Sequence, residues 1–343
     1  MTRAIGMLSG GLDSSVALGL VATQGIDVLA VNFYTGFCTT EVQRRQGGRK
    51  DGTIPRNEAL SRAAKARVDI EIVDIAEEYM SIVTEPRHGT GANVNPCIDC
   101  RAFMLGKARE LMVREGADFV FTGEVLGQRP MSQRRSAMNL VEKDSGLLGR
   151  LVRPLSAQLL PPTIPELEGK LDRTRLLAIR GRGRSVQMRL ARELGIEDYP
   201  SPAGGCCNLT DPAYARRFRD YFAHATLQRM TPEDAVLLAA GRHLRLCAGT
   251  KLIVGRTEGE NAMLERYLRG RARLEAIGVR GPVALVEGDA DEATRLTAAS
   301  IVARYGQGRA LAELEVAWRE GERETRYTVA PHRDDDALDR MRI

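Results

Sequence analysis

The stretch Ala4-Ile-Gly-Met-Leu-Ser-Gly-Gly-Leu-Asp-Ser-Ser15 decides the fold of the N-terminal half. Its first five residues are largely apolar and typical of a buried strand, and two glycines follow at once. Apolar residues then recur at helical spacing over 16–21, and residues 28–33 read as a second buried strand. The sequence therefore predicts a strand, a loop, a helix and a strand, in that order.

The same alternation continues along the chain. It predicts helices near 57–67 and 100–115 and strands at 70–75 and 118–122, which is typical of an α/β domain with a parallel sheet covered by helices. Three prolines within 160–165 favour the end of that domain. We therefore expect a catalytic domain over 1–165, a connecting segment over 166–215 and a smaller α+β domain over 216–343. In the last domain the expected elements are helices at 213–225, 232–240 and 291–304, strands at 251–254 and 283–286, and a hairpin near 311–329.

Composition limits the class of protein. With 343 residues, 43% hydrophobic and 28% charged, the chain suits about two soluble globular domains. It shows no signal peptide and no apolar run of the ~20 residues that span a bilayer, so we expect a cytoplasmic protein without a membrane partner. A net charge of +5 permits a polyanionic partner. The oligomeric state stays open.

The segment Ser9–Ser15 has the chemistry of a phosphate-binding loop. Backbone N–H groups and the positive end of a helix dipole converge on an anion between a strand and a helix. The glycines at 10 and 11 allow close approach, the hydroxyls of Ser14 and Ser15 can donate, and Asp13 can hold Mg²⁺ between phosphates. The segment matches neither the Walker A motif nor the dinucleotide-binding fingerprint.

This segment resembles the PP-loop ATP pyrophosphatases, whose signature SGGxDS is matched in full by Ser9–Ser14. The resemblance implies cleavage of ATP between its α and β phosphates and transfer of AMP to a carbonyl or carboxyl oxygen. A nucleophile then displaces the AMP. That nucleophile is ammonia in the amide-forming branches of the superfamily and sulfide or persulfide in the thiolating ones.

The cysteines favour sulfur chemistry. Cys97 and Cys100 have metal-ligand spacing just before a predicted helix, where the helix N-terminus favours thiolate, and two more thiols follow at Cys206 and Cys207. Adjacent residues rarely both bind one ion, so three thiolates are the expected count. A [4Fe–4S] cluster held by three cysteines exposes one iron that can bind sulfide. Zinc and a redox-active or persulfide cysteine pair are the alternatives.

The chain also resembles bacterial thiouridine synthases, related to the 4-thiouridine synthases and more distantly to the tRNA 2-thiouridylases, over residues 4–218. The resemblance lies in the segments 95–101, 122–133 and 202–206, and it implies an ATP-dependent tRNA sulfurtransferase that adenylates a uridine carbonyl oxygen and replaces it with sulfur. Sulfide or a sulfur-carrier protein is the implied donor. The resemblance assigns Cys97 and Cys100 as cluster ligands, and it gives either Cys206 or Cys207 as the third ligand. The 4-thiouridine synthases carry an RNA-binding extension before the loop, and we expect this chain to differ from them in that respect.

A further resemblance concerns the C-terminal region. The segments 241–246 and 251–256 are similar to the RNA-binding domain of NFACT-type proteins. This implies an RNA partner for the smaller domain, in keeping with tRNA as the substrate.

The expected site combines three groups of residues. Asp99, between the paired cysteines, is either a base or an acid that serves the helix dipole. The expected ATP and Mg²⁺ ligands are Ser9, Gly10, Gly11, Asp13, Ser14, Ser15, Asn32, Gly123 and Glu124. The polar residues Gln128, Arg129, Ser132 and Gln133 contact adenylate or RNA, or form a solvated loop. The basic run Arg180, Arg182 and Arg184 suits phosphate backbones.

Other reactive side chains are expected to be structural. Cys38 and Cys247 lie among apolar residues and are expected to be buried, inert thiols. The four histidines, His88, His224, His243 and His332, form no recognisable metal set.

Two alternative functions remain. One is an amide-forming or ammonia-transfer enzyme that uses the same loop without a cluster. The other is an RNA-binding protein that senses ATP.

Overall fold

The computed structural model describes residues 1–39, 42, 57–196, 199, 207–224 and 230–343. The chain divides into two compact units. The first comprises Met1–Thr35 and Arg56–Gly204, and the second comprises Gly36–Pro55 and Gly205–Ile343.

The first unit is built on a parallel sheet of five strands among the described residues, in the order β3-β2-β1-β4-β5. This confirms the fold class predicted from the alternating pattern. The strands are β1 (Arg3–Met7), β2 (Asp27–Tyr34), β3 (Asp69–Asp74), β4 (Phe119–Thr122) and β5 (Leu151–Val152).

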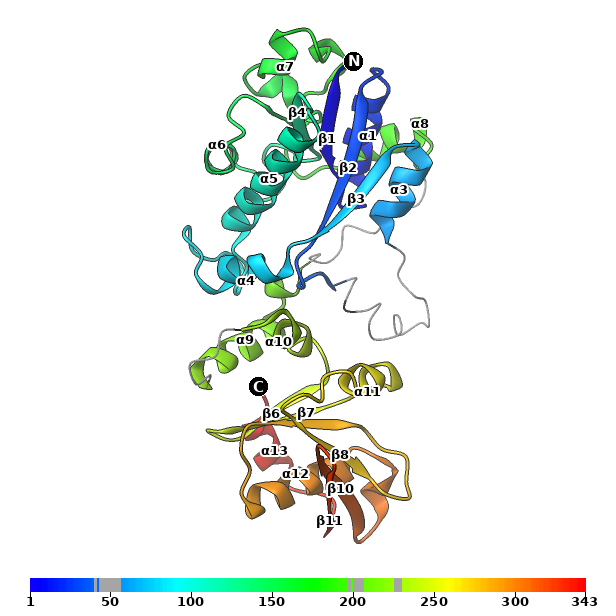
Figure 1. Cartoon of the computed structure of the whole chain (residues 1–343), viewed down its shortest axis with the longest axis vertical. Helices are drawn as coiled ribbons and strands as arrows, with labels where there is room; N and C mark the ends of the chain where they lie inside the picture. Colours follow the sequence, from blue (N-terminus) through cyan, green and yellow to red (C-terminus); the bar gives the residue numbers. More distant parts are fainter. Residues whose placement is uncertain (40–41, 43–56, 197–198, 200–206, 225–229) are drawn as a thin grey trace. The chain divides into compact units, whose positions relative to one another are not determined.

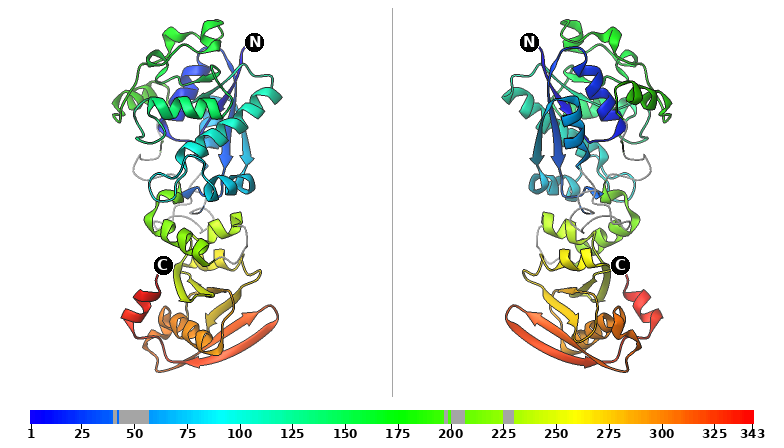
Figure 2. Two further views of the ribbon diagram at one scale, coloured as in Figure 1. Left: turned by 90° about the vertical axis from the view of Figure 1, so that its left-hand side faces the viewer. Right: turned by 90° about the vertical axis from the view of Figure 1, so that its right-hand side faces the viewer.

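Helices cover both faces of this sheet (Figures 1 and 2). Neighbouring residues of β1 show why, because Ala4 packs into one apolar core and Ile5 into the other. A strand buried on both faces is the expected partner of crossover helices. The helices are α1 (Leu12–Ala22), α3 (Glu58–Ala66), α4 (Ala76–Thr84), α5 (Cys97–Arg114), α6 (Arg135–Asp144), α7 (Ile164–Leu167) and α8 (Ser185–Glu193), with short 3₁₀ turns at Ala157–Leu159 and Arg173–Arg175.

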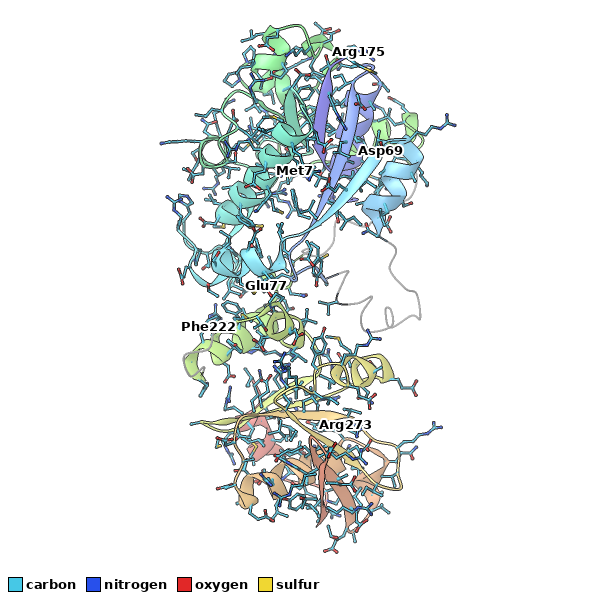
Figure 3. The ribbon with its side chains drawn as sticks, in the orientation of Figure 1. Met7, Asp69, Glu77, Arg175, Phe222 and Arg273 are labelled. Atoms are coloured by element: carbon cyan, nitrogen blue, oxygen red, sulfur yellow. The ribbon has the colours of Figure 1, made fainter. Side chains whose placement is uncertain are left out.

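The strand order places a crevice beside β1. The chain runs from β1 to β2 and β3 on one side and then returns to β4 on the other side of β1, so the strand order reverses there. In open α/β sheets ligands bind at this point, outside the carboxyl ends of the strands. Met7, labelled in Figure 3, is the last residue of β1, and the segment Ser9–Ser15 follows it.

The second unit contains an antiparallel sheet of six strands among its described residues, in the order β11-β10-β8-β9-β7-β6. One apolar core joins the sheet to α12, and another joins it to α10 and α11. The strands are β6 (Arg242–Cys247), β7 (Thr250–Val254), β8 (Ala272–Ala276), β9 (Ala284–Glu287), β10 (Leu314–Glu320) and β11 (Arg323–Val329). The helices are α9 (Pro212–His224), α10 (Pro232–Leu237), α11 (Glu258–Leu264), α12 (Glu292–Arg304) and α13 (Asp335–Met341), with 3₁₀ turns at Asn208–Thr210 and Gln307–Ala310.

The unit boundary differs from the one expected near residue 165. Pro165 does not end the domain, because it lies in the first turn of α7, where its missing N–H costs nothing. Farther along, Leu194 meets the backbone of Gly19 in α1, so α8 packs on the first unit. Phe37 instead packs edge-on against Tyr214 in the second unit, with ring centroids 6.2 Å apart.

In the part of the chain that the structure describes, every helix is too short or too polar to cross a membrane.

Candidate nucleotide and cysteine site

The loop after β1 has the backbone shape that a phosphate seat needs. Gly10 adopts φ +76°, and a Cβ at that position would lie 2.4 Å from the Cβ of Glu58 at the start of α3. Only glycine can adopt this positive φ and lie this close to Glu58 without strain. Gly11 is the N-cap of α1, so the first N–H groups of that helix face the loop. The geometry suits a pyrophosphate group at the positive end of α1.

The serine hydroxyls hold the loop together. Ser14 and Ser15 are buried, and their Oγ atoms donate to the carbonyl of Gly11 at 3.0 and 2.9 Å. The Oγ atoms of Ser9 and Ser14 lie 3.1 Å apart. Asn32 in β2 fixes the entry to the loop, because its Nδ2 donates to the carbonyl of Leu8 at 2.8 Å. Of these hydroxyls, the one on exposed Ser9 is best placed to reach a ligand.

Gly123, which follows β4, closes the other side of the crevice. A Cβ on this residue would lie 2.4 Å from the backbone nitrogen of Ser14. The end of β4 therefore packs directly on the first turn of α1. This contact explains why a glycine stands at this position.

A cation site is suggested by two buried oxygens. Gln128 reaches across from the loop after β4, and its Nε2 donates to Oδ2 of Asp13 at 2.7 Å. The remaining oxygens, Oδ1 of Asp13 and Oε1 of Gln128, are buried and have no hydrogen-bond partner among the described residues. Carboxylate and amide oxygens are ligands that Mg²⁺ accepts, so this pair fits the ion that accompanies ATP.

The basic run meets the same loop. Arg180 pairs with Leu126 in a parallel bridge, and the amide of Gly181 donates to the carbonyl of Leu126 at 2.8 Å. Arg184 is the N-cap of α8, and its Nη2 lies 3.8 Å from Oδ2 of Asp13. Arg180 and Arg182 are exposed. One guanidinium of the run therefore stands beside the phosphate loop, and two face solvent.

Glu124 is buried in an ion network. Its carboxylate lies 3.2 Å from Nε of Arg153 and 3.7 Å from Nε of Arg101. Arg153 also pairs with Glu142 at 2.7 Å and donates to the carbonyl of Met138. These contacts occupy the carboxylate that the sequence assigned to the nucleotide, and they tie β4 to α5 and α6. The sequence reasoning missed Arg153, which follows the two-residue strand β5 without a recognisable motif.

Cys97 and Cys100 lie inside the first turn of α5, which begins three residues earlier than predicted. Residues three apart share a helix face, so both half-buried thiols lie on the same side. Asp99 between them is buried, and its Oδ2 accepts a hydrogen bond from the backbone N–H of His88 at 3.0 Å. This contact gives Asp99 a structural role, since it anchors the segment before α5.

The predicted third ligand is Cys206 or Cys207. Cys206 is outside the described residues, and Cys207 belongs to the second unit. Among the described residues no three His, Cys, Asp or Glu side chains are grouped closely enough to hold a metal ion. Cys97 and Cys100 are therefore the two thiols of the predicted site that lie in the first unit.

The remaining cysteines differ from expectation. Cys247 is exposed rather than buried, its Sγ lies 3.3 Å from Oγ1 of Thr250, and the hydrogen bond with Thr250 lowers the pKa of the thiol. Cys38 is half-buried and stands opposite Cys207 in an isolated antiparallel bridge. Neither position carries a sequence signal that distinguishes it from an inert thiol.

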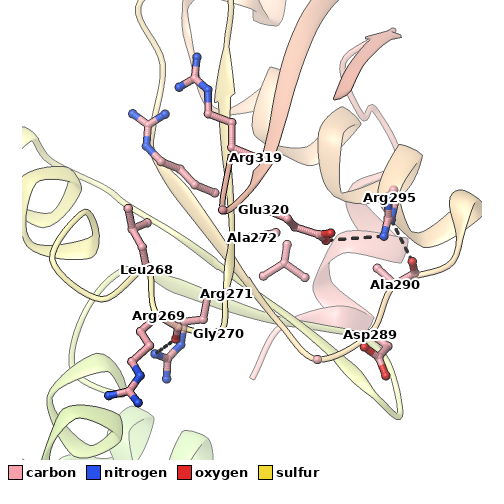
Figure 4. Close-up of a pocket in the computed structure, with 14 residues that line it drawn as sticks. Leu268, Arg269, Gly270, Arg271, Ala272, Asp289, Ala290, Arg295, Arg319 and Glu320 are labelled. Atoms are coloured by element: carbon pink, nitrogen blue, oxygen red, sulfur yellow. Dashed lines mark hydrogen bonds and ion pairs between the residues drawn. The ribbon is translucent and has the colours of Figure 1, made fainter. Parts of the chain in front are cut away.

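A pocket of about 620 Å³ opens in the second unit (Figure 4). It lies where the start of β8 meets the turns that follow β9 and β10, and five arginines line it against two acidic residues. Small residues such as Ala272 and Gly288 also line it. The arginines are Arg269, Arg271, Arg273, Arg295 and Arg319.

Most of these guanidinium groups are held in place. Arg271 pairs with Asp234 and Glu287 at 3.0 and 2.9 Å, and Arg295 lies over the ring of Trp318, 5.1 Å from its centroid. Arg269 has no ion pair among the described residues. The pocket thus presents fixed, planar, positively charged groups, which suit a phosphate.

Comparisons with known proteins agree with both units. Residues 2–144 match the family model of the tRNA methyl transferase HUP domain, and residues 241–341 match that of the NFACT protein RNA binding domain. The tRNA-specific 2-thiouridylase MnmA of Thiobacillus denitrificans is 30% identical over 241 residues, which are 68% of this chain and 59% of that protein. The MnmA of Thermotoga petrophila is 32% identical over 124 residues, 34% of each chain.

The chain therefore spans about three fifths of the first of these relatives and about a third of the second. A solved 4-thiouridine synthetase–RNA complex with bound ATP is 19% identical, with a TM-score of 0.34 over 57% of this chain and 50% of that chain. The family matches confirm the resemblance seen in the sequence: residues 2–144, which carry the SGGxDS loop, are similar to the tRNA methyl transferase HUP domain, and residues 241–341 are similar to the NFACT RNA-binding domain.

Proposed function

We propose that the chain is an ATP-dependent tRNA-thiolating enzyme. It adenylates a carbonyl oxygen of a uridine and then replaces that oxygen with sulfur. The observation that carries the proposal is the arrangement of Asp13, Gln128 and Arg184 at the PP-loop, because it combines an anion seat with two orphaned oxygens for a cation. The similarity to 2-thiouridylases supports tRNA as the substrate class.

Different residues of the site serve different parts of the first step, the adenylation of the uridine oxygen. The loop amides at the start of α1 bind the β and γ phosphates, and Arg184 neutralises charge on the departing pyrophosphate. Asp13 and Gln128 would hold Mg²⁺, which polarises the phosphoryl oxygens when bound. The uridine oxygen attacks the α phosphorus and pyrophosphate leaves. AMP is then the leaving group for sulfur.

Cys97 and Cys100 are the sulfur-handling residues of the proposal. Both lie in the N-terminal turn of α5, where the positive end of the helix dipole favours thiolate. Sulfide or a sulfur-carrier protein supplies the sulfur. We also propose the three-cysteine [4Fe–4S] site, with Cys206 or Cys207 as its third ligand. The described residues do not assemble that site, so no step depends on it, and iron and sulfide analysis of anaerobic protein tests it directly.

RNA contacts are proposed at two places. The exposed Arg180 and Arg182 lie next to the PP-loop in the first unit, and the arginine pocket lies in the second. Both suit phosphate groups, and the NFACT match supports RNA as the ligand of the second unit.

The test follows the products of ATP in the presence of tRNA and sulfide. The full-length chain should form AMP and pyrophosphate, and nucleoside analysis should detect thiolated uridine. Asp13→Asn should lose both products. The matched control Asp69→Asn, on an exposed position of β3, should retain them. Formation of ADP would overturn the proposal. Transfer of AMP to a small acid, without tRNA binding, would also overturn it and would favour the amide-forming alternative.

A further inference from the structure

Cys38 and Cys207 face each other in the second unit. They are 169 residues apart in sequence (207 − 38), yet an isolated antiparallel bridge makes them direct partners. The amide of Asn208 donates to the carbonyl of Phe37 at 2.9 Å. This hydrogen bond lies one residue beyond the pair on each strand, so the two cysteines occupy a non-hydrogen-bonded position.

That position brings side chains together. In a non-hydrogen-bonded antiparallel pair the Cα atoms are about 4.5 Å apart, and the side chains are closer than at hydrogen-bonded positions. Disulfides in proteins join Cα atoms about 4.4–6.8 Å apart. The backbone of this pair therefore already lies within the range that a disulfide spans.

The surrounding contacts keep the pair in register. The carbonyl of Cys207 accepts hydrogen bonds from the backbone N–H of Thr210 at 3.2 Å and from its Oγ1 at 2.8 Å, and the carbonyl of Cys38 accepts one from Val42. Next to the pair, buried Phe37 packs on Tyr214. Burial raises the pKa of Tyr214 well above its usual value, and the neighbouring Cys207 adds to the rise.

We propose that Cys38 and Cys207 form a cross-strand dithiol that closes to a disulfide by exchange with a small disulfide. The thiolate of one cysteine attacks the small disulfide, forming a mixed disulfide and releasing one small thiol. The second thiolate attacks the protein sulfur of that mixed disulfide and releases the second small thiol. Two protein thiols are oxidised and one small disulfide is reduced, and the two protons of the protein thiols end on the two small thiols released. Both cysteines are half-buried, so a small reagent reaches them.

This inference bears on the proposed function but does not depend on it. Closure occupies Cys207, so in the oxidised protein Cys206 is the remaining candidate for the third thiol. The reverse reaction with excess small thiol returns Cys207. The redox state of the pair thus decides whether Cys207 is available as a thiol beside Cys206.

The test uses the full-length Cys206→Ser variant, because Cys206 and Cys207 fall in one proteolytic peptide. The protein is incubated without oxygen with oxidised glutathione, alkylated, digested without reductant and analysed by mass spectrometry. The expected result is one peptide pair joined through Cys38 and Cys207, two hydrogens lighter than the sum of its parts, which excess reduced glutathione removes. Adding Cys38→Ser should convert Cys207 to a glutathione adduct.

The control is Cys247→Ser in the same background. Cys247 is the exposed thiol of this unit, and its removal should leave the cross-link unchanged. The inference is overturned if Cys38 stays alkylated while Cys207 joins Cys97 or Cys100. It is equally overturned if both cysteines carry glutathione and no cross-link forms. Mapping the cross-link in protein with native Cys38 and Cys207 makes the test independent of whether the Cys38 variant folds.

Discussion

Replacing Gly123 by alanine tests the contact that closes the nucleotide crevice. The added Cβ would lie 2.4 Å from the backbone nitrogen of Ser14 and 2.6 Å from its Cα. Both atoms belong to the first turn of α1, so no flexible side chain can move aside. Ordinary van der Waals contact begins at 3.4 Å, and the end of β4 and the PP-loop must therefore separate by about 1 Å (3.4 − 2.4).

The effect of that separation has two parts. Overpacking of this kind costs roughly 1–3 kcal/mol of unfolding free energy. A displacement of about 1 Å at a catalytic group lowers the rate by roughly 100-fold. We expect tRNA-dependent AMP formation to fall by about that factor, with a stability loss small enough for the protein to stay folded.

The matched control is Gly106→Ala in α5. Nothing lies within 4 Å of the Cβ built there, and alanine is preferred over glycine in a helix by about 1 kcal/mol. This variant should keep its activity and gain stability. Steady-state AMP production and urea unfolding measure both variants. Full activity of Gly123→Ala would show that the PP-loop tolerates displacement, and the assignment of this crevice to ATP would be wrong.

Three further predictions concern charge. His243 is buried, and burial lowers its pKa well below the usual value, so the folded protein excludes the proton that the unfolded chain binds. The free energy of unfolding should therefore fall as pH drops below about 6.5, by at most ~1.4 kcal/mol per pH unit, and urea titrations of His243→Gln should lack this slope. Glu124→Gln removes one of the two carboxylates that pair with Arg153, leaving Glu142, and should lower the free energy of unfolding by up to about 3 kcal/mol in urea titrations, whereas an unchanged midpoint would contradict the ion network. Arg269→Gln should lower the slope of log affinity for tRNA against log salt by about 0.7–0.9, while Arg340→Gln, an exposed arginine outside the pocket, should bind like the parent in filter binding.

Local chemistry made much of the fold predictable. The Ser9–Ser14 motif between two apolar stretches indicated the phosphate loop and the parallel sheet, because strand, loop and helix each leave a local pattern. The start of α10 was equally clear: Thr231 and Asp234 form the capping box that hydroxyl and acid at this spacing favour. Cys97 was placed before its helix rather than in it, since helix ends are poorly defined by pattern alone.

Long-range pairing was not predictable. Cys38 and Cys207 come together only because a short segment after β2 packs with the second unit, and nothing near either residue signals this. Arg153 reaches Glu124 from a two-residue strand, too short for any periodicity. Such contacts depend on topology, which local residue patterns do not encode.

The buried contacts of Glu124 have a mechanical consequence. The residue follows Gly123, which touches the PP-loop, and its carboxylate meets Arg101, the neighbour of Cys100. A short chain of contacts within the first unit therefore joins the nucleotide seat to the cysteine turn. If both steps occur in this unit, the distance between adenylation and sulfur delivery is set when the protein folds. In that case the nucleobase, rather than the protein, must move from the site of adenylation to the site of sulfur delivery.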